Sequence, residues 1–437
     1  MQERKPSLFK LLPIAIFVLI YIALGLAFEF ILPKEYGIYQ VPIVVIFLIS
    51  LGVAIIQSPL PSLKEKLAQM AKGLGDANLI TMLIIFLEAG IFVGVIGRKG
   101  AENIVYYILP NCPPYLDLPA IFVSCSLVSM AMGTSVGTIA LMVPIATVMA
   151  QTAHFPVTLC LGAVISGAMF GDNLSLISDT TIAACQYQGC QMKDKFRTNI
   201  AIAIPAALLA IIVFALLARG HSSIEIVGEN SNLVSVIPYF LVLVGGVLGL
   251  NVFIDLLVGI ISGMVISIAS GHIDFLRIFT KMGSGASGMF ETSMVAILVS
   301  AICALIADSG GFEALIIKIK WLCKTKRAGL LGIGILVSAL DVATANNTVA
   351  IIIANPIAKE LAKIYQIAPK KVASVLDIFS CVVQGLLPYG AQMLVALGIA
   401  SQLKAEVSPF DVIPCVVYPF CLCITTVIAI LFMKKDD

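Results

Sequence analysis

The sequence predicts an all-α, polytopic membrane protein built from two inverted repeats of about five transmembrane helices. Each repeat is expected to contain a re-entrant hairpin and a broken helix. The chain is 60% hydrophobic and only 12% charged, whereas soluble domains carry about 25% charged residues. Polar landmarks recur at a nearly constant spacing in the two halves, and Lys and Arg residues fall mainly on one side of the predicted membrane.

The composition also excludes several functional classes. A net charge of +2 on 437 residues leaves no basic surface for nucleic acid. The 11 cysteines are scattered singly, and only three histidines are present, so neither a disulfide framework nor a zinc site is expected. Because the sequence shows no nucleophile–base constellation, metal-ligand spacing or ATP-binding motif, we expect no enzyme and no cofactor, and transport would draw on an ion gradient.

Hydrophobic runs of about 20 residues, the length that crosses a hydrocarbon core of about 30 Å, define the predicted spans. The first run, 8–32, is too long for a signal-peptide core and lacks a cleavage site, so we expect it to remain as a span. The other runs lie near 38–58, 77–97, 155–185, 196–219, 233–249, 251–270, 289–308, 368–402 and 411–433. Two further runs, 118–150 and 329–358, have polar, glycine-containing centres.

An internal repeat divides the chain into two halves. A spacing of 212 residues aligns Pro144 with Pro356 and Asp172 with Gln384. Landmarks that recur at a fixed spacing are typical of chains built from duplicated units. The predicted halves are 1–220 and 230–437.

The distribution of Lys and Arg indicates how the two polar-centred runs lie in the membrane. With a cytoplasmic N-terminus, two re-entrant hairpins give ten spans, with 20 basic residues inside and 7 outside. If both runs cross, twelve spans give 15 and 12. The positive-inside rule favours the hairpins and places both termini in the cytoplasm. Five spans per half also invert the second half relative to the first, as in secondary transporters.

Each half therefore has one hairpin and one broken helix: 118–150 and 155–185 in the first, and 329–358 and 368–402 in the second. The hairpin tips lie at 133–138 and 344–348, and the helix interruptions at 171–181 and 384–392. Glycine and proline free backbone groups at these points, and the membrane tolerates such groups only where they line a protein-enclosed cavity. These four segments predict the functional site.

Two carboxylates, Asp172 and Asp179, lie at membrane depth in the first interruption. A charge there costs between about 2.5 and 17 kcal/mol, so the pair indicates an ion or substrate pathway. Burial favours the protonated carboxyl, whereas a bound cation favours the ionised one, so a single group can exchange H⁺ for Na⁺. We expect Asp172 and Asp179 to be Na⁺ ligands. The full set of predicted ion- or substrate-binding residues is Asp172, Asn173, Ser175, Ser178, Asp179, Thr180, Thr134, Ser135, Asn346, Asn347, Thr348, Gln384 and Gln392.

These residues have structural alternatives, and other buried acids are separate candidates. Hydroxyl side chains in membrane helices often bond the preceding turn, and small polar runs also serve helix packing. Glu88, in the middle of a span, is either a proton site or a buried acid paired with a neighbour. The further candidates are Asp255, Asp341 and Asp377, which lie within or near spans.

The segment Phe170–Thr181, with the sequence FGDNLSLISDTT, resembles the signature of the NhaC-type Na⁺/H⁺ antiporter family. The run 133–138 followed by Pro144 resembles the upstream motif of that family, and Asn346-Asn347-Thr348 is similar to the Ser-Asn-Thr hairpin tip of divalent anion/sodium symporters. Both groups belong to the ion transporter superfamily. The resemblance implies an elevator-like carrier, a homodimer, in the inner (cytoplasmic) membrane. It implies cation-handling roles for Asp172, Asn173, Ser175, Ser178, Asp179 and Thr180.

The chain departs from this family pattern at two positions. Asn173 and Leu176 stand where the family often has Lys and Pro, and the Asn variant looks more like a subgroup proposed to move amino acids. We therefore expect a secondary transporter with Na⁺/H⁺ antiport as its main function. The alternative is a Na⁺- or H⁺-coupled carrier of amino acids or small carboxylates, for which the amides of the second half would supply donors. The residues alone leave both open.

Overall fold

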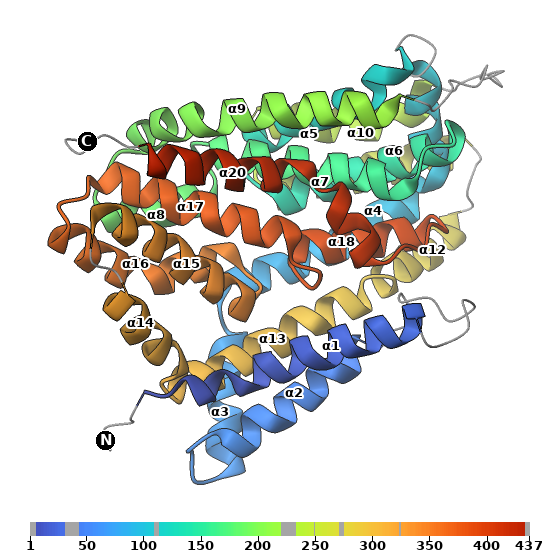
Figure 1. Cartoon of the computed structure of the whole chain (residues 1–437). Coiled ribbons are helices and arrows are strands. Elements are labelled where there is room, and N and C mark those ends of the chain that lie inside the picture. Colours follow the sequence, from blue (N-terminus) through green and yellow to red (C-terminus); the bar gives the residue numbers. More distant parts are fainter. Residues whose placement is uncertain are drawn as a thin grey trace.

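Long apolar helices lie side by side along a common direction in the computed structural model of the chain (Figure 1). The structure describes residues 6–30, 43–108, 113–219, 233–248, 250–270, 275–322 and 325–432, and these contain helices and no strand. The helices of the first predicted half are α1 (Leu12–Phe30), α2 (Ile43–Gln57), α3 (Leu63–Leu74), α4 (Ala77–Ile108), α5 (Asp117–Met132), α6 (Ser135–Thr152), α7 (Val157–Leu174), α8 (Asp179–Gln188) and α9 (Met192–Ala218).

The second predicted half contains the remaining helices. Its helices are α10 (Ile237–Val247), α11 (Val252–Ala269), α12 (Phe275–Ser287), α13 (Phe290–Asp308), α14 (Gly311–Leu322), α15 (Lys326–Thr344), α16 (Asn347–Ile364), α17 (Pro369–Leu386), α18 (Ala391–Gln402), α19 (Pro409–Val412) and α20 (Val417–Leu431). The beginning of α1 and the end of α20 lie at the same side of the bundle (Figure 1).

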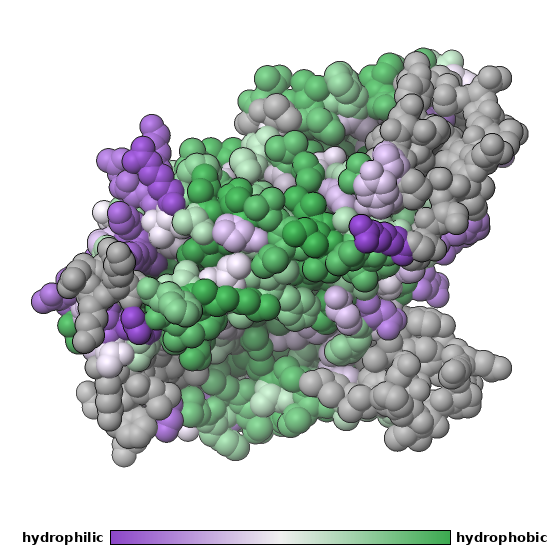
Figure 2. Space-filling model, turned by 45° about the horizontal axis from the view of Figure 1, so that its top comes forward, coloured by the Kyte–Doolittle hydropathy of each residue, from purple (hydrophilic) through white to green (hydrophobic). Residues whose placement is uncertain are grey.

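The outer surface matches a hydrocarbon environment. Hydrophobic side chains cover the middle of the visible face, and hydrophilic ones gather toward its two sides (Figure 2). In α9, Leu208, Ile212 and Leu216 are each more than half exposed, an arrangement that water disfavours and lipid accepts. Within the described residues, eight helices are long and apolar enough to cross a membrane, or nine if the bent pair Pro409–Cys415 and Val417–Leu431 counts as one span. The prediction of an all-α polytopic membrane protein is confirmed, while the ten-span count and the inverted repeats stay predictions.

Each predicted hairpin is a pair of helices joined by a tight turn. The turn between α5 and α6 has Gly133 in the left-handed region (φ 68°), and the turn between α15 and α16 has Ala345 there (φ 50°). Thr134 then caps α6 by accepting from the Gly137 N–H, and Asn346 caps α16 in the same way. Gly133 and Ala345 are 212 residues apart, as are the two caps, so the tips share one local geometry.

Both predicted broken helices are interrupted where the sequence indicates. α7 ends at Leu174 and α8 begins at Asp179, and the segment between them is extended at Ser175 and Ser178. The second interruption, Leu387–Gly390, separates α17 from α18. After its break, α8 packs against α16 and α17, and α18 packs against α6. Each broken helix therefore ends among helices of the other predicted half.

Candidate functional site

The two hairpin tips and the two helix breaks surround one cavity of about 80 Å³. Thr81, Met82 and Ile85 of α4 complete its wall. Eleven of the thirteen predicted binding residues line this cavity: Thr134, Ser135, Asp172, Ser178, Asp179, Thr180, Asn346, Asn347, Thr348, Gln384 and Gln392. Residues that lie up to 258 positions apart in the sequence therefore share one small space.

Helix ends make this cavity polar. Four helices (α6, α8, α16 and α18) begin beside it, and four (α5, α7, α15 and α17) end there. A helix start leaves backbone N–H groups without intrahelical partners, and a helix end leaves carbonyl groups. The cavity can therefore offer carbonyl oxygens to a cation and N–H groups to an anion.

Asp172 lies at the centre of a hydrogen-bonded chain that crosses between the halves. Its Oδ1 accepts from Ser178 Oγ at 2.6 Å, and its Oδ2 accepts from Ser135 Oγ at 3.1 Å. Ser135 Oγ accepts from Gln392 Nε2 at 3.0 Å, and Gln392 Oε1 accepts from Gln384 Nε2 at 2.6 Å. The Asp172 side chain is only 6% exposed, so its carboxyl group is held by two hydroxyl groups in a nearly dry setting.

Asp179 occupies a different environment from Asp172. It lies in the first turn of α8, where the positive end of the helix dipole favours a negative charge. Its side chain is exposed although it lines the same cavity. Thr180 follows it and pairs with Ser178 through their hydroxyls at 2.9 Å. One acid is therefore embedded in the site, and the other stands at its surface.

The second half contributes amides. Asn346 Oδ1 caps α16, its Nδ2 contacts Met82 Sδ at 3.2 Å, and Asn347 Oδ1 accepts from the Thr348 N–H at 3.0 Å. Gln384 Nε2 also donates to the Ala345 carbonyl at 3.2 Å. Gln384 Oε1 is buried without a hydrogen-bond partner in the described part of the chain, although Gln384 itself lines the cavity.

Two of the predicted binding residues lie outside the cavity. Asn173 faces away from it, toward α17, and donates to Asp377 Oδ2 at 2.8 Å. Ser175 Oγ bonds the Met130 carbonyl at 2.9 Å, a link that joins the break to α5. Glu88 is 8% exposed and does not line the cavity, and its Oε2 has no partner among the described residues.

Two of the other candidate acids do not line the cavity. Asp255 and Asp341 are fully buried, outside this lining, and their carboxylate oxygens have no hydrogen-bond partners among the described residues.

Comparison with known proteins identifies the family. Residues 8–219 and residues 222–434 each match the family described as the "Na+/H+ antiporter family". The chain belongs to the Na⁺/H⁺ antiporter family. The resemblance of the segment Phe170–Thr181 to NhaC-type antiporters is thus confirmed. The two matched segments meet near residue 220, where the sequence predicts the division between the halves.

Two curated relatives and one solved structure resemble this antiporter-family chain. It is 28% identical to the malate-2H(+)/Na(+)-lactate antiporter of Bacillus subtilis over 48% of this chain and 43% of that protein. It is 31% identical to the Na(+)/H(+) antiporter NhaC of the same organism over 35% of this chain and 34% of that protein. The alignments thus span less than half the length of these relatives. The YdaH transporter of Alcanivorax borkumensis matches 96% of this chain and 97% of its own at a TM-score of 0.40 and 16% identity.

A buried ion pair lies directly behind the break of this family member. Lys195 Nζ is 2.6 Å from Asp377 Oδ2, and each side chain is only 1% exposed. The sequence predicts Asp377 as a candidate. It places Lys195 between two predicted spans, where the residue serves only to predict the orientation of the chain in the membrane. Asn199, which donates to the same Asp377 oxygen at 3.1 Å, also escaped prediction. The sequence signal that could have indicated this pair is the spacing of Lys195 and Asn199, which are four residues apart near the start of a span and so lie on one helix face.

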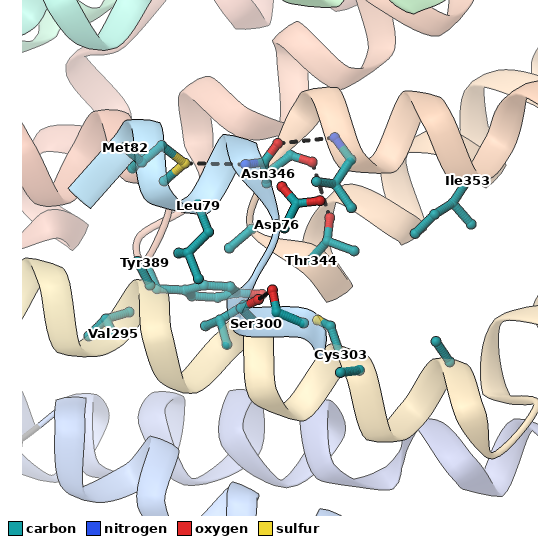
Figure 3. A pocket seen from close by; sticks show the side chains of 18 of the residues that line it. Asp76, Leu79, Met82, Val295, Ser300, Cys303, Thr344, Asn346, Ile353 and Tyr389 are labelled. Carbon is teal, nitrogen blue, oxygen red and sulfur yellow. Dashed lines mark hydrogen bonds between the residues drawn. The ribbon is translucent and has the colours of Figure 1, made fainter. Parts of the chain in front are cut away.

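A second cavity, of about 210 Å³, is shown in Figure 3. It adjoins the first. The two share Met82, Ala345, Asn346 and Ala391 in their walls. Most of the second wall is apolar, with Leu79, Val295 and Ile353 among its side chains, while Ser300, Cys303 and Thr344 add polar atoms. This Na⁺/H⁺ antiporter family member therefore has room for an organic group beside its polar site.

Proposed function

We propose that this chain is a secondary active transporter that exchanges Na⁺ for H⁺ across the cytoplasmic membrane. The observation that carries the proposal is the buried Asp172 carboxylate, held between Ser135 and Ser178 on the wall of the 80 Å³ cavity. A water molecule needs about 10–15 Å³ of such space. The cavity thus has room for a sodium ion with part of its hydration shell.

The exchange follows from the charge balance at Asp172. Na⁺ prefers hard oxygen ligands, and the cavity lining supplies the Asp172 carboxylate, the Ser178 and Thr180 hydroxyls and the carbonyls of helices that end there. When Na⁺ leaves, an ionised carboxylate in this setting lacks a counter-charge, and a proton takes its place because burial favours the neutral form. Na⁺ and H⁺ thus compete for one group. Asp179, at the exposed edge, attracts cations to the entrance.

The membrane arrangement is part of the same proposal. The beginning of α1 and the end of α20 lie on one side of the bundle, which fits an even number of crossings (Figure 1). The excess of basic residues predicted for the inner side supports a cytoplasmic position of both termini. The homodimer implied by the resemblance is also proposed.

A second candidate function is transport of a small carboxylate or amino acid coupled to Na⁺ or H⁺. The adjoining 210 Å³ cavity favours it, because its apolar wall can hold a carbon chain. The starts of α16 and α18 lie at the junction of the two cavities, where their N–H groups can bind a carboxylate. The relative from Bacillus subtilis that is named as a malate and lactate antiporter supports this alternative.

Reconstituted protein distinguishes the two functions. Proteoliposomes receive an inward Na⁺ gradient, and internal pH is followed with and without lactate, malate or a panel of amino acids. Antiport predicts that Na⁺ alone drives H⁺ out and makes the lumen alkaline. If Na⁺ alone moves no protons while a labelled solute accumulates, the carrier of organic solutes is correct and the antiporter proposal is wrong.

A further inference from the structure

The Lys195 ammonium is surrounded by oxygen atoms in the manner of a bound metal cation. It donates to the Asn173 carbonyl at 2.8 Å and to Thr181 Oγ1 at 2.7 Å, and it pairs with Asp377 Oδ2 at 2.6 Å. An ammonium has three N–H donors, so each donor has one oxygen. These three oxygens, from a carbonyl, a hydroxyl and a carboxylate, could also act as ligands of a hard monovalent cation.

These three oxygens come from both sides of the first helix break. Asn173 belongs to the last turn of α7, and Thr181 lies in the first turn of α8. Thr181 Oγ1 also donates to the Ser175 carbonyl at 2.9 Å, inside the break itself. The third oxygen comes from α17, in the other predicted half. The ammonium therefore connects the two arms of the broken helix with the opposite half of the chain.

Two amide side chains also donate hydrogen bonds to Asp377. Its Oδ2 also accepts from Asn173 Nδ2 at 2.8 Å and from Asn199 Nδ2 at 3.1 Å, and Ser374 Oγ donates to Asn199 Oδ1. Every member of this cluster is at most 1% exposed. Asn173 is adjacent in sequence to Asp172, whose carboxylate faces the cavity on the other side of α7.

We propose that the oxygens around Lys195 form a second monovalent cation site at the first helix break, which the lysine ammonium fills as a built-in cation. The fixed charge holds the break in the geometry that presents Asp172 and Ser178 to the cavity. Lys195 is thus a positioning residue. A free monovalent cation replaces the ammonium when the side chain is removed, because the Asp377 carboxylate then lacks a positive partner, while the Asn173 carbonyl keeps only its bond from Asn199 Nδ2. This inference concerns binding and does not depend on the transported solute.

The test uses the purified full-length Lys195→Ala variant and methylammonium as the probe. Thermal unfolding is measured against increasing methylammonium chloride, with choline chloride at equal ionic strength as the reference cation. We expect a saturable rise of the unfolding temperature with methylammonium in Lys195→Ala and none in the wild type. The matched control is Lys193→Ala, an exposed lysine on the same helix, which should behave as the wild type.

Removal of the carboxylate provides the opposite control. The double variant Lys195→Ala/Asp377→Asn has no unpaired charge, so its unfolding temperature should not respond to methylammonium. If Lys195→Ala responds equally to methylammonium and choline, the proposed site does not exist. If the single variant cannot be purified, it is expressed and extracted in either salt. Recovery of monodisperse protein only with methylammonium supports the site, and equal failure in both salts overturns it.

Discussion

Replacement of Asp172 by Asn tests the proposed exchange most directly, because it removes one charge and keeps the shape of the side chain. A unit charge about 4 Å from a cation contributes about 4 kcal/mol at the effective dielectric constant of about 20 that suits protein sites. Each 1.4 kcal/mol is a factor of about ten in affinity. We therefore expect Asp172→Asn to weaken Na⁺ binding by roughly three orders of magnitude and to abolish Na⁺-driven H⁺ movement.

The assay pairs binding with transport. Na⁺ binding is followed by the shift of the unfolding temperature with NaCl against choline chloride, and exchange by internal pH in proteoliposomes. Asp179→Asn is the matched control, because Asp179 lines the same cavity but is exposed. An exposed charge pair contributes about 0.2–1 kcal/mol, so this variant should lose at most about fivefold in affinity. If Asp172→Asn keeps its Na⁺ half-saturation within threefold of the wild type, Asp172 is not the exchanging group.

Further predictions concern the hairpin tips and the chain of amides. Gly133→Ala should destabilise the protein by about 1–2 kcal/mol in thermal unfolding, because φ is 68° and the added Cβ would lie 2.7 Å from Ile177 Cγ1; a neutral effect would show that the tip can relax. Ala345→Gly at the matching position should stabilise it, by up to about 1 kcal/mol, since φ is 50° there; a lower unfolding temperature would contradict this. Gln392→Leu removes the donor to Ser135 and should raise the Na⁺ half-saturation about threefold to tenfold in the liposome assay; an unchanged value would remove Gln392 from the site.

The positions of the hairpin tips and helix breaks could be predicted because their polar residues stand within hydrophobic runs. Polar residues with glycine or proline inside runs of hydrocarbon-compatible residues need enclosure by protein. Gly171–Thr181 and Gln384–Gln392 satisfy this condition, and the structure places both around one cavity. Such a pattern is local, so a single sequence contains it.

The difference between Asp172 and Asp179 could not be predicted. In a continuous helix of 3.6 residues per turn, residues seven apart lie on the same face. The sequence therefore predicts the same role, that of a Na⁺ ligand, for both acids. The break after Leu174 redirects the chain, and Asp179 becomes an exposed residue of a new helix start. The outcome depends on the angle between α7 and α8, which packing against α16 and α17 determines.

The Lys195–Asp377 pair escaped prediction for a related reason. The two residues are 182 positions apart, and each looks unremarkable in its own segment. A lysine at the edge of a hydrophobic run usually marks the membrane surface, where it can reach water. Only the packing of α9 against α17 shows that this lysine turns inward to a carboxylate.

The two halves contribute unequal chemistry to the site, and this inequality limits how many cations it can hold. At the spacing of 212 residues, Gln384 corresponds to Asp172 and Ala391 to Asp179, so the second half places neutral residues where the first has acids. Two embedded carboxylates that faced each other would repel and share a proton. With an amide at the matching position, Gln384 instead donates through Gln392 and Ser135 toward Asp172. One embedded acid then remains in the cavity, and in the proposed exchange one Na⁺ or one H⁺ occupies it at a time.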